Sequence, residues 1–201
     1  EKSSDYNLIA NNYVEMGNAN GIYFVKSNNN TVRGNTVNCT ADKTDFFCVG
    51  IQSTGTDNIY ESNRITKTTI GIGAGANANV NNNIISNVTQ SGINAGANSN
   101  VNGNTITNCT LKDSAISVSG ANSTISGNNI DVKGASKGIS ANNNDIKVFD
   151  NNIKTETGAC IYQSSKRSGL LVSNNNLTSV SGVGVLAQKS TDMIINNNNI
   201  S

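Results

Sequence analysis

The chain has no proline, tryptophan or histidine, and only 4% of its 201 residues are aromatic. Without histidine it cannot form a Ser-His-Asp triad, a Cys-His pair or an imidazole-ligated metal site. Charged residues make up 13% of the chain and the net charge is +1, so it carries no basic footprint for nucleic acid. Its apolar runs are only a few residues long, so a membrane-spanning helix is not expected.

Asparagine is unusually abundant in place of these residue types. The chain contains 39 Asn and 19 Gly, and hydrophobic residues are 35% of the total, against about 45–50% in average domains. Without a repeat, such a composition would indicate disorder. With a repeat, it indicates a thin solenoid, which needs little apolar mass per residue.

A short pattern recurs along the whole chain: an apolar residue, two others, Asn, one other and a second apolar residue. Segments 70–87 and 91–108 show the repetition most clearly, because 12 of their 18 positions agree at an offset of 21. Successive pattern Asn lie 20 to 28 residues apart, a period typical of solenoids. The nine pattern Asn are Asn12, Asn35, Asn63, Asn83, Asn104, Asn128, Asn151, Asn175 and Asn198.

Two further columns complete each period. About ten residues after each Asn a small residue precedes Ile or Val, as in Gly71-Ile72 and Gly92-Ile93, and alternation with a period of two indicates short strands. Three residues before each first apolar position stands a residue able to adopt positive φ. These turn formers are Asn29, Asp57, Asn77, Asn98, Asn122, Asp145, Gly169 and Asp192. Each period therefore contains three short strands and three bends.

Three strands per turn, stacked on equivalent strands above and below, predict an all-β, single-stranded parallel β-helix of about nine coils over residues 1–201. Neighbouring coils of such a rod lie about 4.8 Å apart. The pattern Asn would satisfy backbone groups at a buried bend, where each unpaired group costs about 1–3 kcal/mol. Their amides would also bond to one another from coil to coil, so we expect an internal Asn ladder with a structural role.

The four cysteines show no metal-ligand spacing. Cys109 and Cys160 are interpreted as small buried residues. A Cys39–Cys48 bridge that closes one loop is the only disulfide we would consider. The cysteines therefore do not indicate whether the protein resides in an oxidising or a reducing compartment.

The repeated VxxNxI and Gly-Ile columns resemble the right-handed parallel β-helix superfamily of pectate-lyase-like proteins, over essentially the whole chain. The resemblance implies a right-handed coil, which agrees with the general handedness of crossovers. That superfamily includes polysaccharide lyases, glycoside hydrolases, epimerases, phage tailspikes and surface repeat proteins. In its carbohydrate-active members sugars lie along the Gly-Ile strand and its flanking loops. The outward residues of that strand implied to bind carbohydrate here are Tyr23, Gln52, Asn94 and Tyr162.

The largest departure from the period is the loop 38–48, about five residues longer than its neighbours. It carries Asp42, Lys43 and Asp45, and Glu15 ends the corresponding strand one coil earlier. Paired carboxylates are what glycoside hydrolysis requires, so Asp42, Asp45 and Glu15 are candidate catalytic residues, with Lys43 a candidate sugar ligand. The same groups with backbone oxygens would suit Ca²⁺, but no spacing supports it and no cofactor is expected. A solvated loop with ordinary surface charges is the simpler alternative.

Asp113 is a further candidate catalytic residue, with Lys112 beside it and Lys137 one coil later. Lyases use Lys, Arg or Tyr as the base that abstracts a proton next to a sugar carboxylate. The three arginines lie on distant coils, however, and no cluster matches a lyase signature. Ordinary surface charge is again the simpler alternative.

Three functions remain open from the sequence. The first is an extracellular carbohydrate-recognising rod, such as the β-helix region of a phage tailspike or a polysaccharide-degrading domain. The others are a non-catalytic structural or adhesive surface protein, and a polysaccharide lyase. The expected partner is a polysaccharide or cell-surface glycan, not nucleic acid or a membrane, and the expected location is extracellular, on a cell surface or on a virion. No capping helix is evident, so we expect a segment of a longer chain or a homotrimer whose rod ends are covered.

Overall fold

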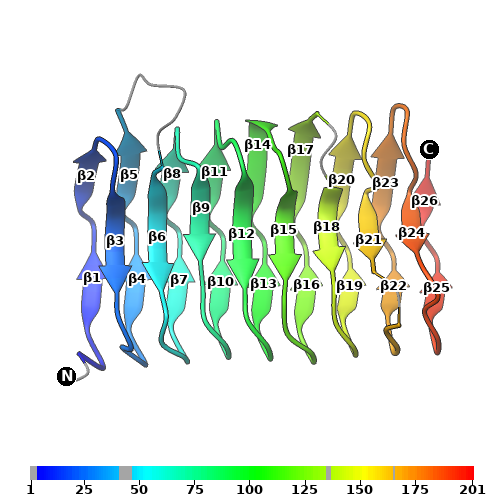
Figure 1. Ribbon diagram of the computed structural model, residues 1–201, viewed down its shortest axis with the longest axis horizontal. Coiled ribbons are helices and arrows are strands. Elements are labelled where there is room, and N and C mark those ends of the chain that lie inside the picture. Colours follow the sequence, from blue (N-terminus) through cyan, green and yellow to red (C-terminus); the bar gives the residue numbers. More distant parts are fainter. Residues whose placement is uncertain (1–3, 41–46, 135–136, 165) are drawn as a thin grey trace.

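The computed structural model describes residues 4–40, 47–134, 137–164 and 166–201. These residues form 26 short strands in three parallel sheets and contain no helix (Figure 1). Consequently, no helix among them could cross a membrane. The all-β prediction is confirmed.

Each coil contributes one strand to each sheet. Sheet A contains β1 (Leu8–Ala10), β4 (Thr31–Arg33), β7 (Ile59–Glu61), β10 (Asn79–Asn81), β13 (Asn100–Asn102), β16 (Thr124–Ser126), β19 (Lys147–Phe149), β22 (Leu171–Ser173) and β25 (Ile194–Asn196). Sheet B contains β2 (Tyr13–Met16), β5 (Thr36–Cys39), β8 (Arg64–Thr66), β11 (Ile84–Ser86), β14 (Thr105–Thr110), β17 (Asn129–Lys133), β20 (Asn152–Thr155), β23 (Asn176–Ser179) and β26 (Asn199–Ile200). Sheet C contains β3 (Asn20–Phe24), β6 (Val49–Ser53), β9 (Ile70–Gly73), β12 (Ser91–Ala95), β15 (Ser114–Val118), β18 (Lys137–Ala141), β21 (Ile161–Gln163) and β24 (Val185–Ala187).

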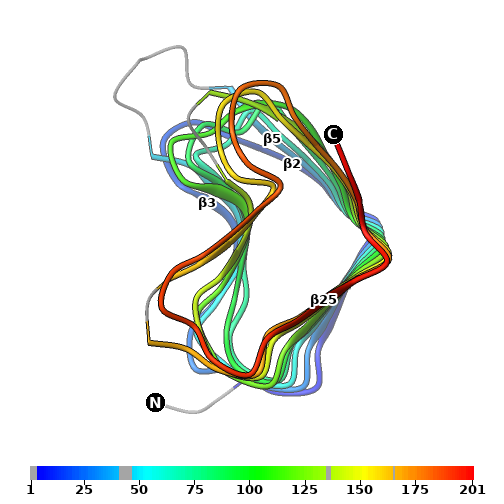
Figure 2. The ribbon, with the colours of Figure 1, turned by 90° about the vertical axis from the view of Figure 1, so that its right-hand side faces the viewer.

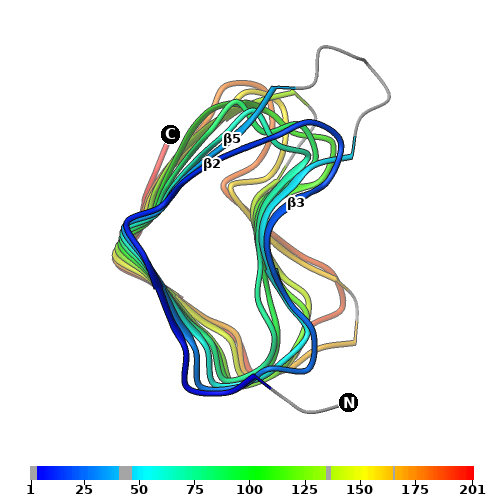
Figure 3. The same ribbon diagram turned by 90° about the vertical axis from the view of Figure 1, so that its left-hand side faces the viewer.

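The coils lie directly over one another. Every strand pairs in parallel with the equivalent strand of the next coil, as Val80 does with Val101 and Ile85 with Ile106. The end-on views show the coils nearly superimposed (Figures 2 and 3). Among the described residues, sheets A and B have nine strands and sheet C has eight, so the predicted β-helix of about nine coils is confirmed.

Sheets A and B meet at a bend of two residues, here called the AB bend, and its second residue is always a pattern Asn. Asn104 is fully buried there and donates from Nδ2 to Asn128 Oδ1 over 3.0 Å. The same bond links every neighbouring pair from Asn12 to Asn198, at 2.9 to 3.0 Å. The predicted Asn ladder therefore runs through all nine coils.

Backbone conformation explains the residue types at the bends. All eight predicted turn formers between sheets C and A, in what we call the CA bend, have positive φ, for example Asn77 at 55° and Gly169 at 70°. The first residue of the AB bend also has positive φ in every coil, a column that the sequence analysis did not separate. Its members are Asn11, Gly34, Ser62, Asn82, Gly103, Gly127, Asp150, Asn174 and Asn197. Asn, Asp and Gly tolerate this conformation best, which accounts for the residues found there.

Apolar columns from the three sheets fill the interior. The central residues Val101, Ile106 and Ile93 are fully buried. The small residue before each sheet C isoleucine leaves room for this packing, because a Cβ on Gly50 would lie 2.5 Å from Ile65 Cγ2 and 2.6 Å from the Gly71 carbonyl oxygen. Small side chains thus let sheets B and C approach closely.

A second polar column, which the sequence analysis missed, lines the end of the CA bend in the first coils. Asn7 Nδ2 donates to Asn30 Oδ1 and Asn30 Nδ2 to Asn58 Oδ1, at 2.9 and 3.0 Å. The next coil has Ala78 at this position, and the two coils after it have Ser99 and Ser123, which accept backbone N–H bonds at 3.2 and 3.1 Å. Later coils place apolar side chains at the same position, so the column is polar only in the first part of the rod.

Candidate functional site

The outer face of sheet C carries the residues that were expected to contact sugars. The outline of the rod bends inward along this sheet, so the face lies between two protruding bends (Figures 2 and 3). The outward positions form one continuous row in register from coil to coil. In order, they are Tyr23, Gln52, Gly73, Asn94, Ser117, Ser140, Tyr162 and Leu186. Tyr23 and Tyr162 lie six strands apart, or about 29 Å, so they would contact different parts of an extended ligand.

A pocket of about 400 Å³ opens on this face in the C-terminal coils. Lys137, at the start of β18, places Nζ 4.7 Å from the centre of the Tyr162 ring on β21. Leu186 of β24 extends the floor, and the bends between sheets B and C, here called the BC bends, supply the wall. The wall residues are Thr157, Gly158, Ala159, Ser181, Gly182 and Val183. The pocket therefore offers an aromatic ring, an ammonium group, hydroxyls and apolar surface within three coils.

Asp113 lies one coil away from this pocket. It occupies the BC bend before β15, where its carbonyl oxygen accepts the Lys137 backbone N–H over 3.0 Å. Its carboxylate accepts from Ser114 Oγ over 3.3 Å. Of the candidate catalytic residues in the described part of the chain, Asp113 is the one beside the pocket.

Glu15 lies instead on the outer face of sheet B. It pairs in register with Asn38 and accepts a hydrogen bond from the Tyr13 hydroxyl over 2.9 Å, which raises the pKa of that phenol. Glu15 on β2 and Asp113 just before β15 lie four coils apart, about 19 Å along the rod. The carboxylates of a glycosidase pair lie about 5–10 Å apart, so Glu15 and Asp113 are not brought together as such a pair.

Asp42, Lys43 and Asp45 lie outside the described residues. Both ends of their loop are fixed, however. Cys39 ends β5 and is bonded to Cys48, with 6.5 Å between their Cα atoms, so the single disulfide considered from the sequence is present. The Phe47 backbone N–H donates to Asn18 Oδ1 over 2.7 Å, which joins the end of the loop to the preceding coil.

Cys109 and Cys160 are free and buried, and burial raises the pKa of both thiols. We expect neither thiol to react with iodoacetamide in the native protein at neutral pH, because the nucleophile is the thiolate. Unfolding without a reductant should expose two reactive thiols per chain and unfolding with a reductant four, measured by mass spectrometry. Four thiols without reductant would contradict the disulfide.

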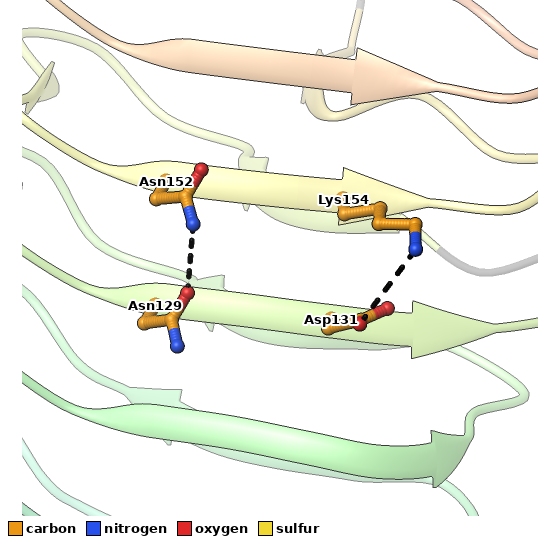
Figure 4. A network of polar contacts seen from close by, with 4 residues as sticks. All are labelled: Asn129, Asp131, Asn152 and Lys154. Carbon is orange, nitrogen blue, oxygen red and sulfur yellow. Dashed lines mark hydrogen bonds and ion pairs between the residues drawn. The ribbon is translucent and has the colours of Figure 1, made fainter.

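The described residues contain no group of three or more His, Cys, Asp or Glu side chains that could hold a metal ion. Polar contacts also occur on the outer face of sheet B, where Asn152 Nδ2 donates to Asn129 Oδ1 over 2.9 Å (Figure 4). Beside them, Lys154 Nζ lies 3.9 Å from Asp131 Oδ2, and both side chains are more than half exposed. An exposed pair of this kind contributes about 0–1 kcal/mol, so this network belongs to the surface and forms no binding centre.

Comparison with known proteins supports the fold. Residues 67–200 match the family model described as the right-handed beta helix region. No curated protein matches the chain in sequence. The chain is similar to a double mutant of the tailspike protein of E. coli bacteriophage HK620, with TM-score 0.58 and 12% identity. It is also similar to that phage's tailspike protein in complex with a pentasaccharide, with TM-score 0.55 and 12% identity.

In both tailspike comparisons the match covers 94% of this chain and 41% of the tailspike chain, so this chain spans less than half of that length. The catalytic domain of a GH87 alpha-1,3-glucanase in complex with nigerose gives a TM-score of 0.43 at 8% identity, over 99% of this chain and 62% of that chain. This TM-score is too low to indicate a shared fold. The family match covers about two thirds of the residues, and the coils, the bends and the ladder agree with it. The chain therefore belongs to the right-handed β-helix family.

Proposed function

We propose that the chain binds a polysaccharide or cell-surface glycan along the outer face of sheet C. The observation that carries this proposal is the continuous row from Tyr23 to Leu186, with the pocket of Lys137 and Tyr162 on it. Aromatic rings suit the apolar faces of sugar rings, and the hydroxyls and amides of the row suit sugar hydroxyls. A tailspike of similar fold, solved in complex with a pentasaccharide, supports the same kind of ligand.

Replacing Tyr162 by Ala tests the proposal. Loss of the ring should weaken binding of a glycan selected from an array about tenfold, because burial of about 50 Å² of apolar surface contributes about 1.3 kcal/mol, close to a tenfold change in Kd. Tyr13→Ala is the matched control, since Tyr13 is 66% exposed on the outer face of sheet B. Isothermal titration calorimetry measures both variants. Equal losses in the two variants, or no loss at Tyr162, would refute the assignment of sheet C.

A hydrolytic activity is the finer form of the same proposal, with Asp42, Asp45, Glu15 and Asp113 as its candidate carboxylates. New reducing ends released from the bound glycan, and their loss in the Asp42→Asn, Asp45→Asn double variant or in Asp113→Asn, would support cleavage. Binding without release of reducing ends would favour the adhesive alternative. Elimination by a lyase would add an unsaturated sugar end, which absorbs in the ultraviolet.

We also propose an extracellular setting, on a virion or a cell surface, which the tailspike likeness supports, and assembly as a homotrimer. Light scattering during size-exclusion chromatography distinguishes a particle of three chains from one of a single 20.9 kDa chain.

A further inference from the structure

Charge is distributed unevenly along the sheet C face. Residues 157–191 contain Lys166, Arg167 and Lys189 and no Asp or Glu. This segment builds β21 and β24 and most of the bends beside them, while Glu156 begins the BC bend before β21 and Asp192 lies in the CA bend after β24. The last coils of the face are therefore bordered by more cationic side chains (Lys137, Lys166, Arg167 and Lys189) than anionic ones (Glu156 and Asp192).

The cationic residues border the face on two sides. Lys137 begins β18 and extends over Tyr162 at the BC side. At the CA side, Lys166 and Lys189 follow β21 and β24, and the Lys166 backbone N–H donates to the Lys189 carbonyl oxygen over 3.4 Å. The two lysines thus occupy equivalent places in neighbouring coils, across the sheet from Lys137.

Two of these cationic groups, Lys137 Nζ and Arg167 Nε, lack an anionic partner among the described residues. Lys137 has no ion-pair partner among the described residues, in contrast to Lys154, whose Nζ lies 3.9 Å from Asp131 Oδ2. Arg167 Nε is buried and has no hydrogen-bond acceptor among the described residues. A cation over an aromatic ring keeps its full charge, so Lys137 Nζ can still attract an incoming anion.

The pocket itself carries no carboxylate. Its lining combines the Lys137 ammonium and the Tyr162 ring with the apolar Leu186 and Val183 side chains and the hydroxyls of Thr157 and Ser181. A sugar that carries a carboxylate would fit this set. Its apolar ring face would lie on Tyr162 and Leu186, its hydroxyls would meet Thr157 and Ser181, and its carboxylate would accept from Lys137 Nζ.

Building on the proposed glycan-binding function, we propose that the pocket of Lys137 and Tyr162 is a subsite for an acidic monosaccharide, a uronic or sialic acid unit of the bound glycan. Lys137 selects the carboxylate, and the bordering Lys166, Arg167 and Lys189 provide a favourable field for neighbouring acidic units. Tyr162 contributes to binding of acidic and neutral sugars alike.

The test uses hexasaccharides of galacturonan, alginate, hyaluronan and polysialic acid, each beside its neutral form with the carboxylates reduced to alcohols. We expect at least one acidic hexasaccharide to bind ten or more times tighter than its neutral form, with a preference that narrows in 500 mM NaCl. Lys137→Gln should remove that preference and leave the affinity for the neutral form within twofold. Lys154→Gln, which removes an equally long lysine from sheet B, should retain the preference. Circular dichroism verifies that both variants fold.

The outcomes separate the two proposals. Neutral and acidic forms that bind equally well, with binding that still depends on Tyr162, would overturn the acidic subsite and leave the glycan-binding function standing. A preference for the acidic form that persists in Lys137→Gln would overturn the role of this pocket. Binding that is unaffected by Tyr162→Ala would overturn both proposals.

Discussion

Asn104→Ala should lower the free energy of unfolding by about 3 kcal/mol and the melting temperature by about 10 °C. Asn104 Oδ1 accepts from both the backbone N–H and Nδ2 of Asn83, each over 2.9 Å. Its Nδ2 donates to the Val80 carbonyl oxygen over 2.8 Å. The substitution removes the acceptor of the Asn83 backbone N–H and the donor from Nδ2 to the Val80 carbonyl oxygen, while Asn83 Nδ2 keeps the Tyr60 carbonyl oxygen at 2.9 Å. Each buried group left without its partner costs about 1–3 kcal/mol.

Asn100→Ala is the control for this prediction. Asn100 lies in the same coil but is exposed on the outer face of sheet A, where its Nδ2 donates to Asn79 Oδ1 over 3.2 Å. Its replacement should change stability by no more than about 0.5 kcal/mol. Thermal unfolding followed by circular dichroism compares the two variants. Equal melting temperatures would show that the internal ladder contributes no more than the surface amides do.

Gly50→Val should destabilise the rod by about 3 kcal/mol. A Cβ there would lie 2.6 Å from the Gly71 carbonyl oxygen and 2.5 Å from Ile65 Cγ2, so both the next coil and sheet B would have to move. The backbone oxygen cannot yield without breaking the strand pairing of β6 with β9. Chemical denaturation measures the loss.

Gly73→Val provides the comparison within the same sheet. Gly73 is one of the outward positions, and a Cβ on it would lie 3.5 Å from Gln52 Cγ, an ordinary contact. Valine also suits a strand better than glycine, so stability should be unchanged or slightly raised. If both valine variants lost the same stability, the small-residue column would reflect strand propensity and not the close approach of sheets B and C.

The repeat made most of the fold predictable. The pattern Asn, the turn formers with positive φ and the Gly-Ile column each recur once per coil, so a single period specifies all three. The column of positive-φ residues before the pattern Asn was not predicted, because Ser62 and Asp150 interrupt a column that otherwise holds only Asn and Gly. The polar column of Asn7, Asn30 and Asn58 was missed for a related reason, since it persists in only part of the rod.

The candidate site was less predictable because it depends on features that the period does not encode. The row of outward residues on sheet C follows from the Gly-Ile columns, because the resemblance indicates that sugars lie along the Gly-Ile strand of each coil. The pocket depends on how far the BC bends protrude, and their lengths and sequences differ from coil to coil. The sequence places Lys137 one coil after Asp113, but its contact with Tyr162 depends on the pairing of β18 with β21. Sequence alone therefore indicated which face of the rod carries the candidate site but not where the pocket lies on that face.

A crystal structure of the protein with the tightest-binding oligosaccharide from the panel tests the central claim most directly. The account predicts sugar rings over β18, β21 and β24, with one ring against Tyr162 and a carboxylate within hydrogen-bonding distance of Lys137 Nζ. Sugar density on the outer face of sheet A or sheet B, with sheet C empty, would contradict it.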